Sequence, residues 1–132
     1  MTENAWTKPS TWLVLLLGLF MLLNTARAFA DPFGFSVYMG LPLTDRANDG
    51  FVQVYALRAA FLGFFALALL WLGNTRALAL FATVAIMMPV GDAILTASHH
   101  ASPLIVARHA ATAIVLAVTA ALLANRAAKE YA

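Results

Sequence analysis

Long apolar runs dominate the chain and recur with the length that a bilayer requires. A helix that spans a membrane needs about 20 predominantly apolar residues. Four segments of this kind are separated by polar breaks, and we expect helices over residues 12–30, 51–72, 75–97 and 103–125. The pattern predicts an all-α integral membrane four-helix bundle, with residues 1–132 forming a single transmembrane domain.

The connections between these runs differ in length. Residues 31–50 hold two prolines, three glycines and three aspartates, a composition typical of a loop. We expect one long loop there, lying over the mouth of the bundle. The other connections are short, so neighbouring helices are expected to run antiparallel, up and down.

Charged residues at the ends of the runs predict the orientation. Basic residues prevail on the side that both termini share with the connection between the second and third helices: Lys8, Arg76, Arg126 and Lys129. On the other side, Arg46 is outnumbered by acidic residues: Asp31, Asp45 and Asp49. By the positive-inside rule both termini should be cytoplasmic, and the expected location is a bacterial inner (plasma) membrane.

The first run has a second interpretation. Lys8, the apolar residues 12–23 and the small residues around Ala28 also fit a secretory signal peptide, which would be removed. Arg27 inside the cleavage segment argues against it. Whether residues 1–30 are cleaved is left open, and the other three helices would keep their orientation in either case.

Composition agrees with a lipid environment and narrows the function. Apolar residues make up 63% of the chain and charged residues 11%, far from the balance of a soluble domain. The absence of cysteine excludes disulfides, thiolate metal sites and cysteine nucleophiles. Although the net charge is +2, the basic residues are scattered, so we expect no nucleic-acid partner. Membrane lipid is the expected partner, and the apolar exterior also permits a homo-oligomer.

Several polar residues lie inside the predicted spans. Charged groups in hydrocarbon are costly and by default indicate a functional site. At about 1.5 Å of rise per residue they lie roughly 5–10 Å below the outer boundary. This layer predicts a pocket that opens outward, built from residues of all four helices: Asn24, Arg27, Tyr55, Arg58, Asp92, Arg108, His109 and Thr112.

The residue types suggest acid–base chemistry on an oxygen-bearing lipophilic molecule. In this hypothesis Arg58 binds a carbonyl or anionic oxygen, His109 exchanges a proton and Asp92 orients the histidine. Five other members of the layer would bind the ligand: Asn24, Arg27, Tyr55, Arg108 and Thr112. An isomerase or cyclase reaction fits best, because no cofactor motif is visible.

Less specific interpretations stay open. Arg58 and Asp92 could form a structural ion pair, with His109 in an interhelical hydrogen bond, in an accessory subunit of a membrane complex without catalysis. We expect no metal site, because the adjacent His99 and His100 would point roughly 100° apart on a helix. A proton-coupled carrier is disfavoured by the apolar cytoplasmic half of the helices.

Proline and glycine predict local features of the bundle. Pro89 removes a backbone hydrogen bond and should bend the third helix before Asp92. Gly91 is expected to let a neighbouring helix approach closely. Gly18 in the first helix and Gly63 in the second are expected to mark close helix contacts.

The same residues carry a resemblance that runs from the first helix to the fourth. The chain resembles a family of small four-helix membrane proteins of unknown function, loosely akin to DoxX-like proteins. The resemblance rests on residues in all four helices and the long loop: Arg27, Pro32, Gly40-Leu41-Pro42, Tyr55, Arg58, Gly63, Pro89, Gly91-Asp92 and His109. Where the family pattern has an aspartate after the second-helix arginine, this chain has Ala59. The resemblance implies the architecture and no particular chemistry.

Overall fold

The computed structural model describes residues 6–130, and helix accounts for nearly all of them. Its elements are α1 (Pro9–Ala30), α2 (Pro32–Met39), the 3-10 turn η2 (Arg46–Asn48), α3 (Asp49–Trp71), α4 (Thr75–Ala85), α5 (Met87–Ser98) and α6 (Pro103–Glu130). Four stretches are long and apolar enough to cross a membrane: Pro9–Ala30, Arg46–Trp71, Thr75–Ser98 and Pro103–Glu130. The prediction of an all-α protein with four membrane-spanning helices is confirmed.

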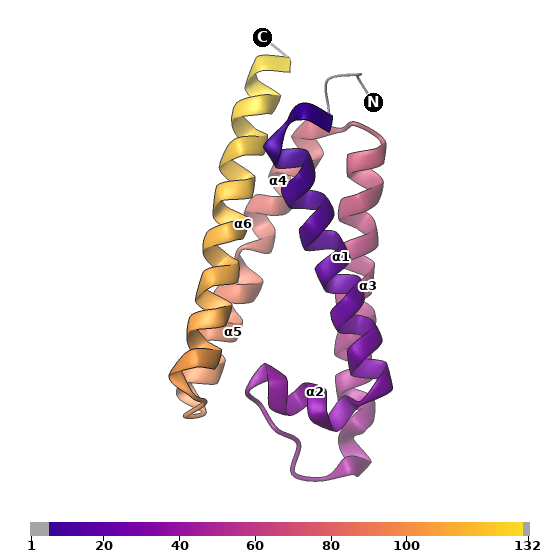
Figure 1. Cartoon of the computed structure of the whole chain (residues 1–132), viewed down its shortest axis with the longest axis vertical. Coiled ribbons are helices and arrows are strands. Elements are labelled where there is room, and N and C mark those ends of the chain that lie inside the picture. The colour runs from indigo at the N-terminus through magenta and orange to yellow at the C-terminus, as the bar shows by residue number, and fades with distance from the viewer. Residues whose placement is uncertain (1–5, 131–132) are drawn as a thin grey trace.

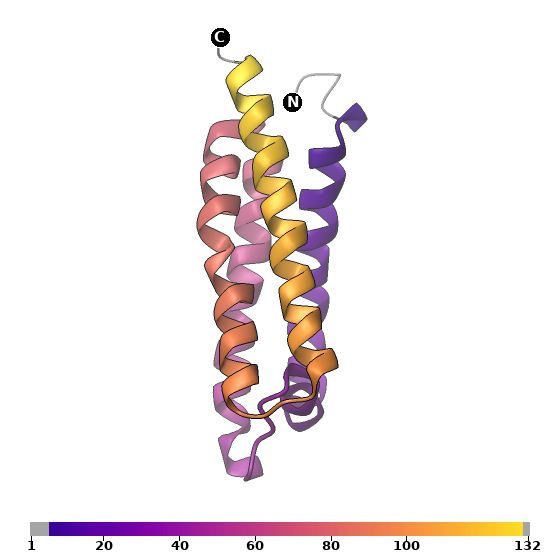
Figure 2. The same ribbon diagram turned by 90° about the vertical axis from the view of Figure 1, so that its left-hand side faces the viewer.

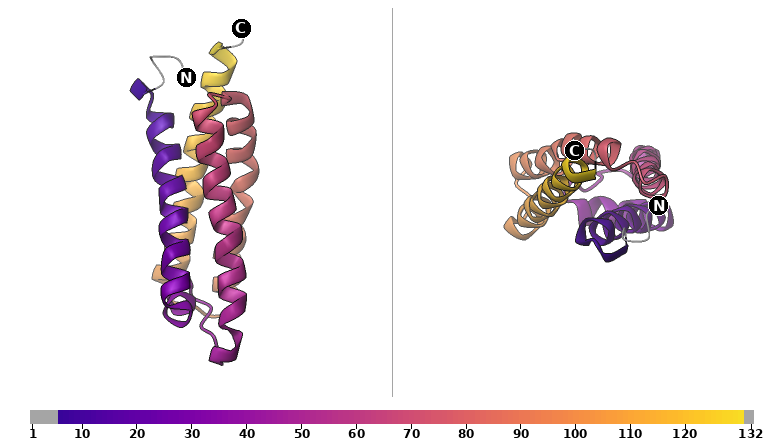
Figure 3. Two further views of the ribbon diagram at one scale, coloured as in Figure 1. Left: turned by 90° about the vertical axis from the view of Figure 1, so that its right-hand side faces the viewer. Right: turned by 90° about the horizontal axis from the view of Figure 1, so that it is seen from above.

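The four spans divide into two halves (Figure 1). α1 packs along α3 in one half, while α6 packs along α4 and α5 in the other. Figure 2 shows α6 in front of both α1 and the α4–α5 segment, and Figure 3 shows α1 beside α3. The beginning of α1 and the end of α6 lie at one end of the bundle, here named the terminal end, and α2 lies at the other, the α2 end.

The segment between the first two spans contains a helix where the sequence predicted only loop. α2 begins after Asp31, whose side chain accepts a hydrogen bond from the backbone N–H of Gly34, and it ends at Gly40 with a φ of 87°. Proline at the first helical position and glycine at the C-cap define the helix locally. The prediction of an uninterrupted loop over residues 31–50 was therefore wrong. Figure 1 shows α2 lying across the end where the two halves diverge, which agrees with the predicted place over the mouth.

Two glycines let α1 and α3 approach closely. A Cβ atom on Gly63 would lie 3.1 Å from the carbonyl oxygen of Gly18, and one on Gly18 would lie 2.9 Å from Leu67. Beside this contact the hydroxyl of Thr25 lies 3.0 Å from the carbonyl oxygen of Ala56 on α3. The expected role of Gly18 and Gly63 is confirmed, because the residues allow backbone-to-backbone contact.

The third span is interrupted between α4 and α5. The break falls at Ile86, three residues before Pro89, which has no N–H to give to the carbonyl of Ala85. The predicted bend is thus present. The prediction for Gly91 was wrong, since a Cβ atom there would meet nothing within 4 Å. Gly91 faces open space, and no neighbouring helix uses its small size.

A polar cluster joins the two halves at the terminal end. Arg126 of α6 donates a hydrogen bond to the hydroxyl of Thr11 on α1, over 3.1 Å. It also pairs with Glu130, over 2.6 Å. The Arg126 side chain is only 13% exposed and Thr11 is fully buried. This cluster fastens α1 to α6 at the end opposite α2.

Candidate functional site

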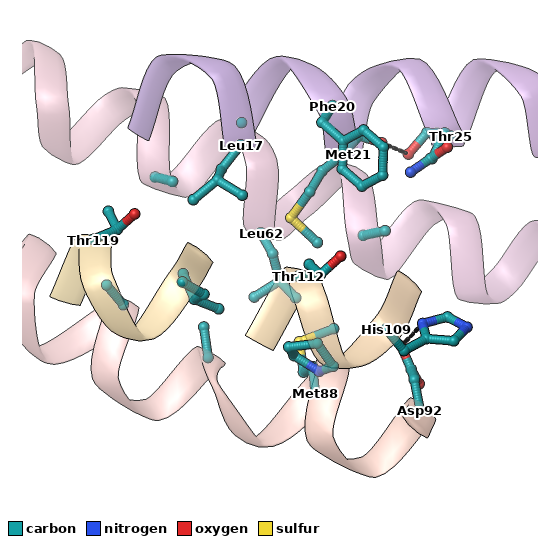
Figure 4. Close-up of a pocket in the computed structure, with 18 of the residues that line it drawn as sticks. Leu17, Phe20, Met21, Thr25, Leu62, Met88, Asp92, His109, Thr112 and Thr119 are labelled. Carbon is teal, nitrogen blue, oxygen red and sulfur yellow. Dashed lines mark hydrogen bonds and ion pairs between the residues drawn. The ribbon is translucent and has the colours of Figure 1, made fainter. Parts of the chain in front are cut away.

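An elongated cavity of about 150 Å³ lies between the two halves of the bundle. Its walls come from α1, α3, α4, α5 and α6, and three residues of α2 line its end: Phe35, Tyr38 and Met39. Most of the lining is aliphatic or aromatic, as at Leu17 and Leu62. Figure 4 shows His109 and Asp92 near one end of the group and Thr119 near the other. The cavity therefore has one polar end and an apolar shaft.

The polar end is centred on His109. This side chain is almost fully buried, and its Nε2 atom lies 3.2 Å from the carbonyl oxygen of Met39, the last residue of α2. Its Nδ1 atom lies 3.9 Å from a carboxylate oxygen of Asp92 on α5. Because a carbonyl oxygen can only accept, Nε2 carries a proton and Nδ1 is the atom directed to Asp92. The histidine thus joins α6 to α2 and faces a carboxylate.

Arg108, the neighbouring residue, holds the end of α2 as well. Its guanidinium donates a hydrogen bond to the carbonyl oxygen of Tyr38 and lies 3.7 Å from the centre of the Tyr38 ring. The last carbonyls of a helix have no partner within the helix, and the negative end of the helix dipole favours cations. Arg108 and His109 therefore serve as a cap for α2 supplied by another helix.

Gly40 seats α2 against the α5–α6 hairpin. A Cβ atom at Gly40 would lie 2.7 Å from Ile105, and 3.3 Å from both Ala101 and Thr96. Its φ of 87° is one that residues with a side chain rarely adopt. Only glycine fits both the turn and the contact, so the position of α2 over the cavity is fixed by steric fit as well as by hydrogen bonds.

Asn24 of α1 supplies an unsatisfied polar atom to the cavity wall. Its Oδ1 atom is buried and accepts no hydrogen bond within the described residues. Asn24 lies six residues before the end of α1, and Asp92 lies six residues before the end of α5. At about 1.5 Å per residue both lie about 9 Å from the α2 end. Asn24 therefore belongs to the same polar layer as Asp92.

The structure brings together most of the residues that the sequence selected. The cavity is lined by six of them: Asn24, Tyr55, Asp92, Arg108, His109 and Thr112. Arg58 is exposed and does not line it. The expectation that Arg58 faces Asp92 in a pocket therefore does not match its position. The reason is the rotation of α3 about its axis. The face that carries Tyr55, Ala59 and Leu62 lines the cavity. Arg58 lies roughly 70° away from the centre of that face.

Arg27 also lies outside the main cavity. It is exposed at the end of α1, and its guanidinium lies 5.2 Å from the centre of the Tyr38 ring. Together with Asp31 it lines a separate shallow hollow between α1 and α2. Its contact is with Tyr38 of α2, so Arg27 positions that helix and does not itself line the cavity.

Two features of the site were missed from the sequence. The first is the use of backbone carbonyls of Tyr38 and Met39 as partners for α6. The second is α2 itself, for which the sequence carries a signal in Asp31-Pro32 and Gly40, a capping residue with proline and then a terminal glycine. The partner carbonyls have no sequence signal, because every residue has a carbonyl.

Metal ligation finds little support in the geometry. Within residues 6–130 no three His, Asp or Glu side chains gather closely enough to hold a metal ion. His99 is bonded locally, with its Nδ1 atom 2.9 Å from the carbonyl oxygen of Leu95. The chemistry that the described residues do offer is hydrogen bonding and proton exchange at the polar end of an apolar cavity.

Comparison with known families identifies the family of the chain. The sequence model of a family described as "Domain of unknown function (DUF4267)" matches residues 11–123, which include the second and third spans and most of the first and fourth. No curated protein matches the chain, and no solved structure matches it. The chain belongs to the DUF4267 family, a family of unknown function.

Proposed function

We propose that this member of the DUF4267 family binds a lipophilic small molecule that carries an oxygen group, in the cavity between its two halves. The observation that carries the proposal is the polarity of that cavity. One end holds His109, Asp92 and Asn24, while most of the remaining lining is apolar. Ligand sites commonly combine an apolar wall with a few placed polar groups. Cavities of about this volume hold a group the size of benzene.

The route of access in this proposal is from the bilayer. Phe20 and Tyr55 line the cavity, and they are also 41% and 37% exposed. Phe20 belongs to α1 and Tyr55 to α3, so both lie in the half opposite α4–α6. A lipophilic molecule would pass between the halves beside these rings. By the distribution of basic residues, the α2 end would face the outer side of the membrane and both termini the cytoplasm.

His109 and Asp92 would exchange a proton with the bound molecule. The 3.9 Å between Nδ1 and the carboxylate leaves room for a ligand atom to approach either group. The isomerase or cyclase chemistry considered from the sequence required Arg58 to bind the reacting oxygen. Since Arg58 is exposed, the proposal is binding with proton exchange, and isomerisation would rest on His109 and Asp92 alone.

A second candidate function is a structural or accessory subunit. The side chains of Arg108 and His109 both form hydrogen bonds with backbone carbonyls of α2. Such bonds are expected of residues that stabilise the fold. In that case substitutions at the polar end would lower stability without affecting any bound molecule. A larger complex would then be recovered in mild detergent.

Native mass spectrometry of the protein released from gentle detergent tests the proposal. Wild type should retain a discrete small molecule, and Asp92→Leu should lose it. Arg58→Ala is the matched control, because Arg58 lies at similar depth but outside the cavity, and it should retain the molecule. An empty wild-type protein, or ordinary phospholipid alone on all three proteins, would contradict the proposal and favour the accessory subunit.

A further inference from the structure

Two hydrogen-bond acceptors at the polar end of the cavity have no donor among the described residues. The Oδ1 atom of Asn24 is buried without a partner. The carboxylate of Asp92 has His109 as its nearest ionic partner, at 3.9 Å, which is beyond hydrogen-bond distance. Within the described residues no group donates a hydrogen bond to that carboxylate.

The histidine adds a further acceptor in its neutral form. With the Nε2 proton directed to the carbonyl of Met39, the Nδ1 atom of neutral His109 presents a lone pair to Asp92. Two acceptors then face each other across a gap. A buried acceptor without a donor costs about 1–3 kcal/mol, so a donor that enters the gap is favoured.

Several donors of the same region are directed to backbone carbonyls, although the Arg108 guanidinium keeps further N–H groups. Arg108 donates to the carbonyl of Tyr38, and the hydroxyl of Thr112 donates to the carbonyl of Arg108 over 3.0 Å. The hydroxyl of Thr25 is directed to the carbonyls of Met21 and Ala56, each 3.0 Å away. A ligand therefore meets donors on Arg108, Asn24 and Tyr55. It also meets acceptors that no described residue satisfies, on Asp92, Asn24 and neutral His109.

From these unsatisfied acceptors we infer that the ligand donates a hydrogen bond, and that it is a lipophilic alcohol and not an oxyanion. The inference rests on the proposed function and specifies its ligand. A hydroxyl group can donate to Asp92 or to Oδ1 of Asn24 while it accepts from the Asn24 amide. A carboxylate or phosphate would instead meet the Asp92 carboxylate in a region of low dielectric, where like charges repel strongly. An ether or ketone would leave the acceptors unsatisfied.

Methionine methyl groups give a site-specific readout of binding. Met21, Met39 and Met88 line the cavity, whereas Met87 is 70% exposed and does not line it. The protein would be labelled with ¹³C at the methionine methyl groups and titrated in detergent with three probes. These are cyclohexylmethanol, its methyl ether and cyclohexanecarboxylate, which share one ring and differ in the head group. Met87 reports partition into the detergent, so only shifts that it does not share count as binding.

The alcohol should shift the three cavity methionines saturably and bind about tenfold more tightly than the ether, as one hydrogen bond to a charged or buried acceptor implies. The carboxylate should bind more weakly still. In Asp92→Asn, which keeps the shape of the side chain, the carboxylate should regain affinity relative to the alcohol. Asn24→Leu should reduce the advantage of the alcohol over the ether.

Two failures can be told apart. Equal binding of alcohol and ether, or tighter binding of the carboxylate, would overturn the inference and leave the binding site in place. The absence of saturable shifts at Met21, Met39 and Met88 with all three probes would overturn the proposed function itself. The comparison of the three probes uses the wild-type protein, so it does not depend on the folding of any variant.

Discussion

Replacement of Gly40 by alanine should release α2 from the mouth of the cavity. The new Cβ atom would lie 2.7 Å from Ile105, well inside the contact distance of two carbon atoms. The φ of 87° adds a backbone cost of about 1–2 kcal/mol for a residue with a side chain. Overpacking of a fitted contact costs typically about 1–3 kcal/mol. The docked position of α2 should therefore lose about 2 kcal/mol or more.

Hydrogen exchange measures this loss locally. The backbone N–H groups of Gly40 and Leu41 donate to the carbonyls of Val37 and Ser36, so their protection reports the closed end of α2. A loss of about 2 kcal/mol corresponds to roughly 30-fold faster exchange when opening limits access. Exchange in the middle of α3 and α6 should change little, because the substitution affects a local opening.

Gly50→Ala is the matched control. A Cβ atom at Gly50 would meet nothing within 4 Å, and this glycine lies in the first turn of α3, where alanine favours the helix. Exchange at Gly40 and Leu41 should stay as in the wild type. If Gly40→Ala left the protection of α2 unchanged, or if both variants reduced it equally, the steric account of how α2 is seated would be refuted.

Three further predictions concern how the helices are joined, each measured by thermal unfolding in detergent. Arg126→Met should lower stability by about 1–3 kcal/mol, because a largely buried hydrogen bond to α1 is lost. Lys129→Met is the control at an exposed position and should have little effect. Gly63→Ala should destabilise the protein by about 1 kcal/mol, because the new methyl group would crowd α1. Gly91→Ala should leave the stability unchanged or raise it. A larger loss of stability in Gly91→Ala than in Gly63→Ala would contradict the packing described. Thr25→Val should cost about 0.6 kcal/mol, the usual value of a hydrogen bond between membrane helices, and an unchanged midpoint would mean that the bond to α3 contributes nothing.

The membrane-spanning helices could be predicted from the sequence because hydrocarbon imposes a strict length and composition on each span. The polar layer could be predicted for a related reason. Charged groups inside a span nearly always face the interior of the bundle or a water-filled cavity. Asp92 and His109 were found in this way, on the third and fourth helices, which the short connection between them predicts to be neighbours.

What the sequence could not supply was the rotation of each helix and the fold of the connection. Arg58 and Tyr55 are three residues apart on α3, yet only Tyr55 lines the cavity. The apolar residues of α3 surround the helix, so no amphipathic face indicated which side turns inward. α2 was missed because its glycines and prolines suit a loop as well as a short helix, and because its partners on α6 lie about 70 residues away in the chain.

Saturable photolabelling tests the central claim most directly, namely that a lipophilic molecule occupies the cavity between the two halves. Membranes that contain the protein would be irradiated with a diazirine derivative of cyclohexylmethanol, with and without an excess of the unlabelled alcohol, and the labelled peptides mapped. The account predicts that the competitor removes label from cavity residues such as Leu62 and Met88, while label on the exposed Leu57 and Met87 persists. Label that is spread over the exposed residues, with none at cavity residues that the competitor removes, would contradict it.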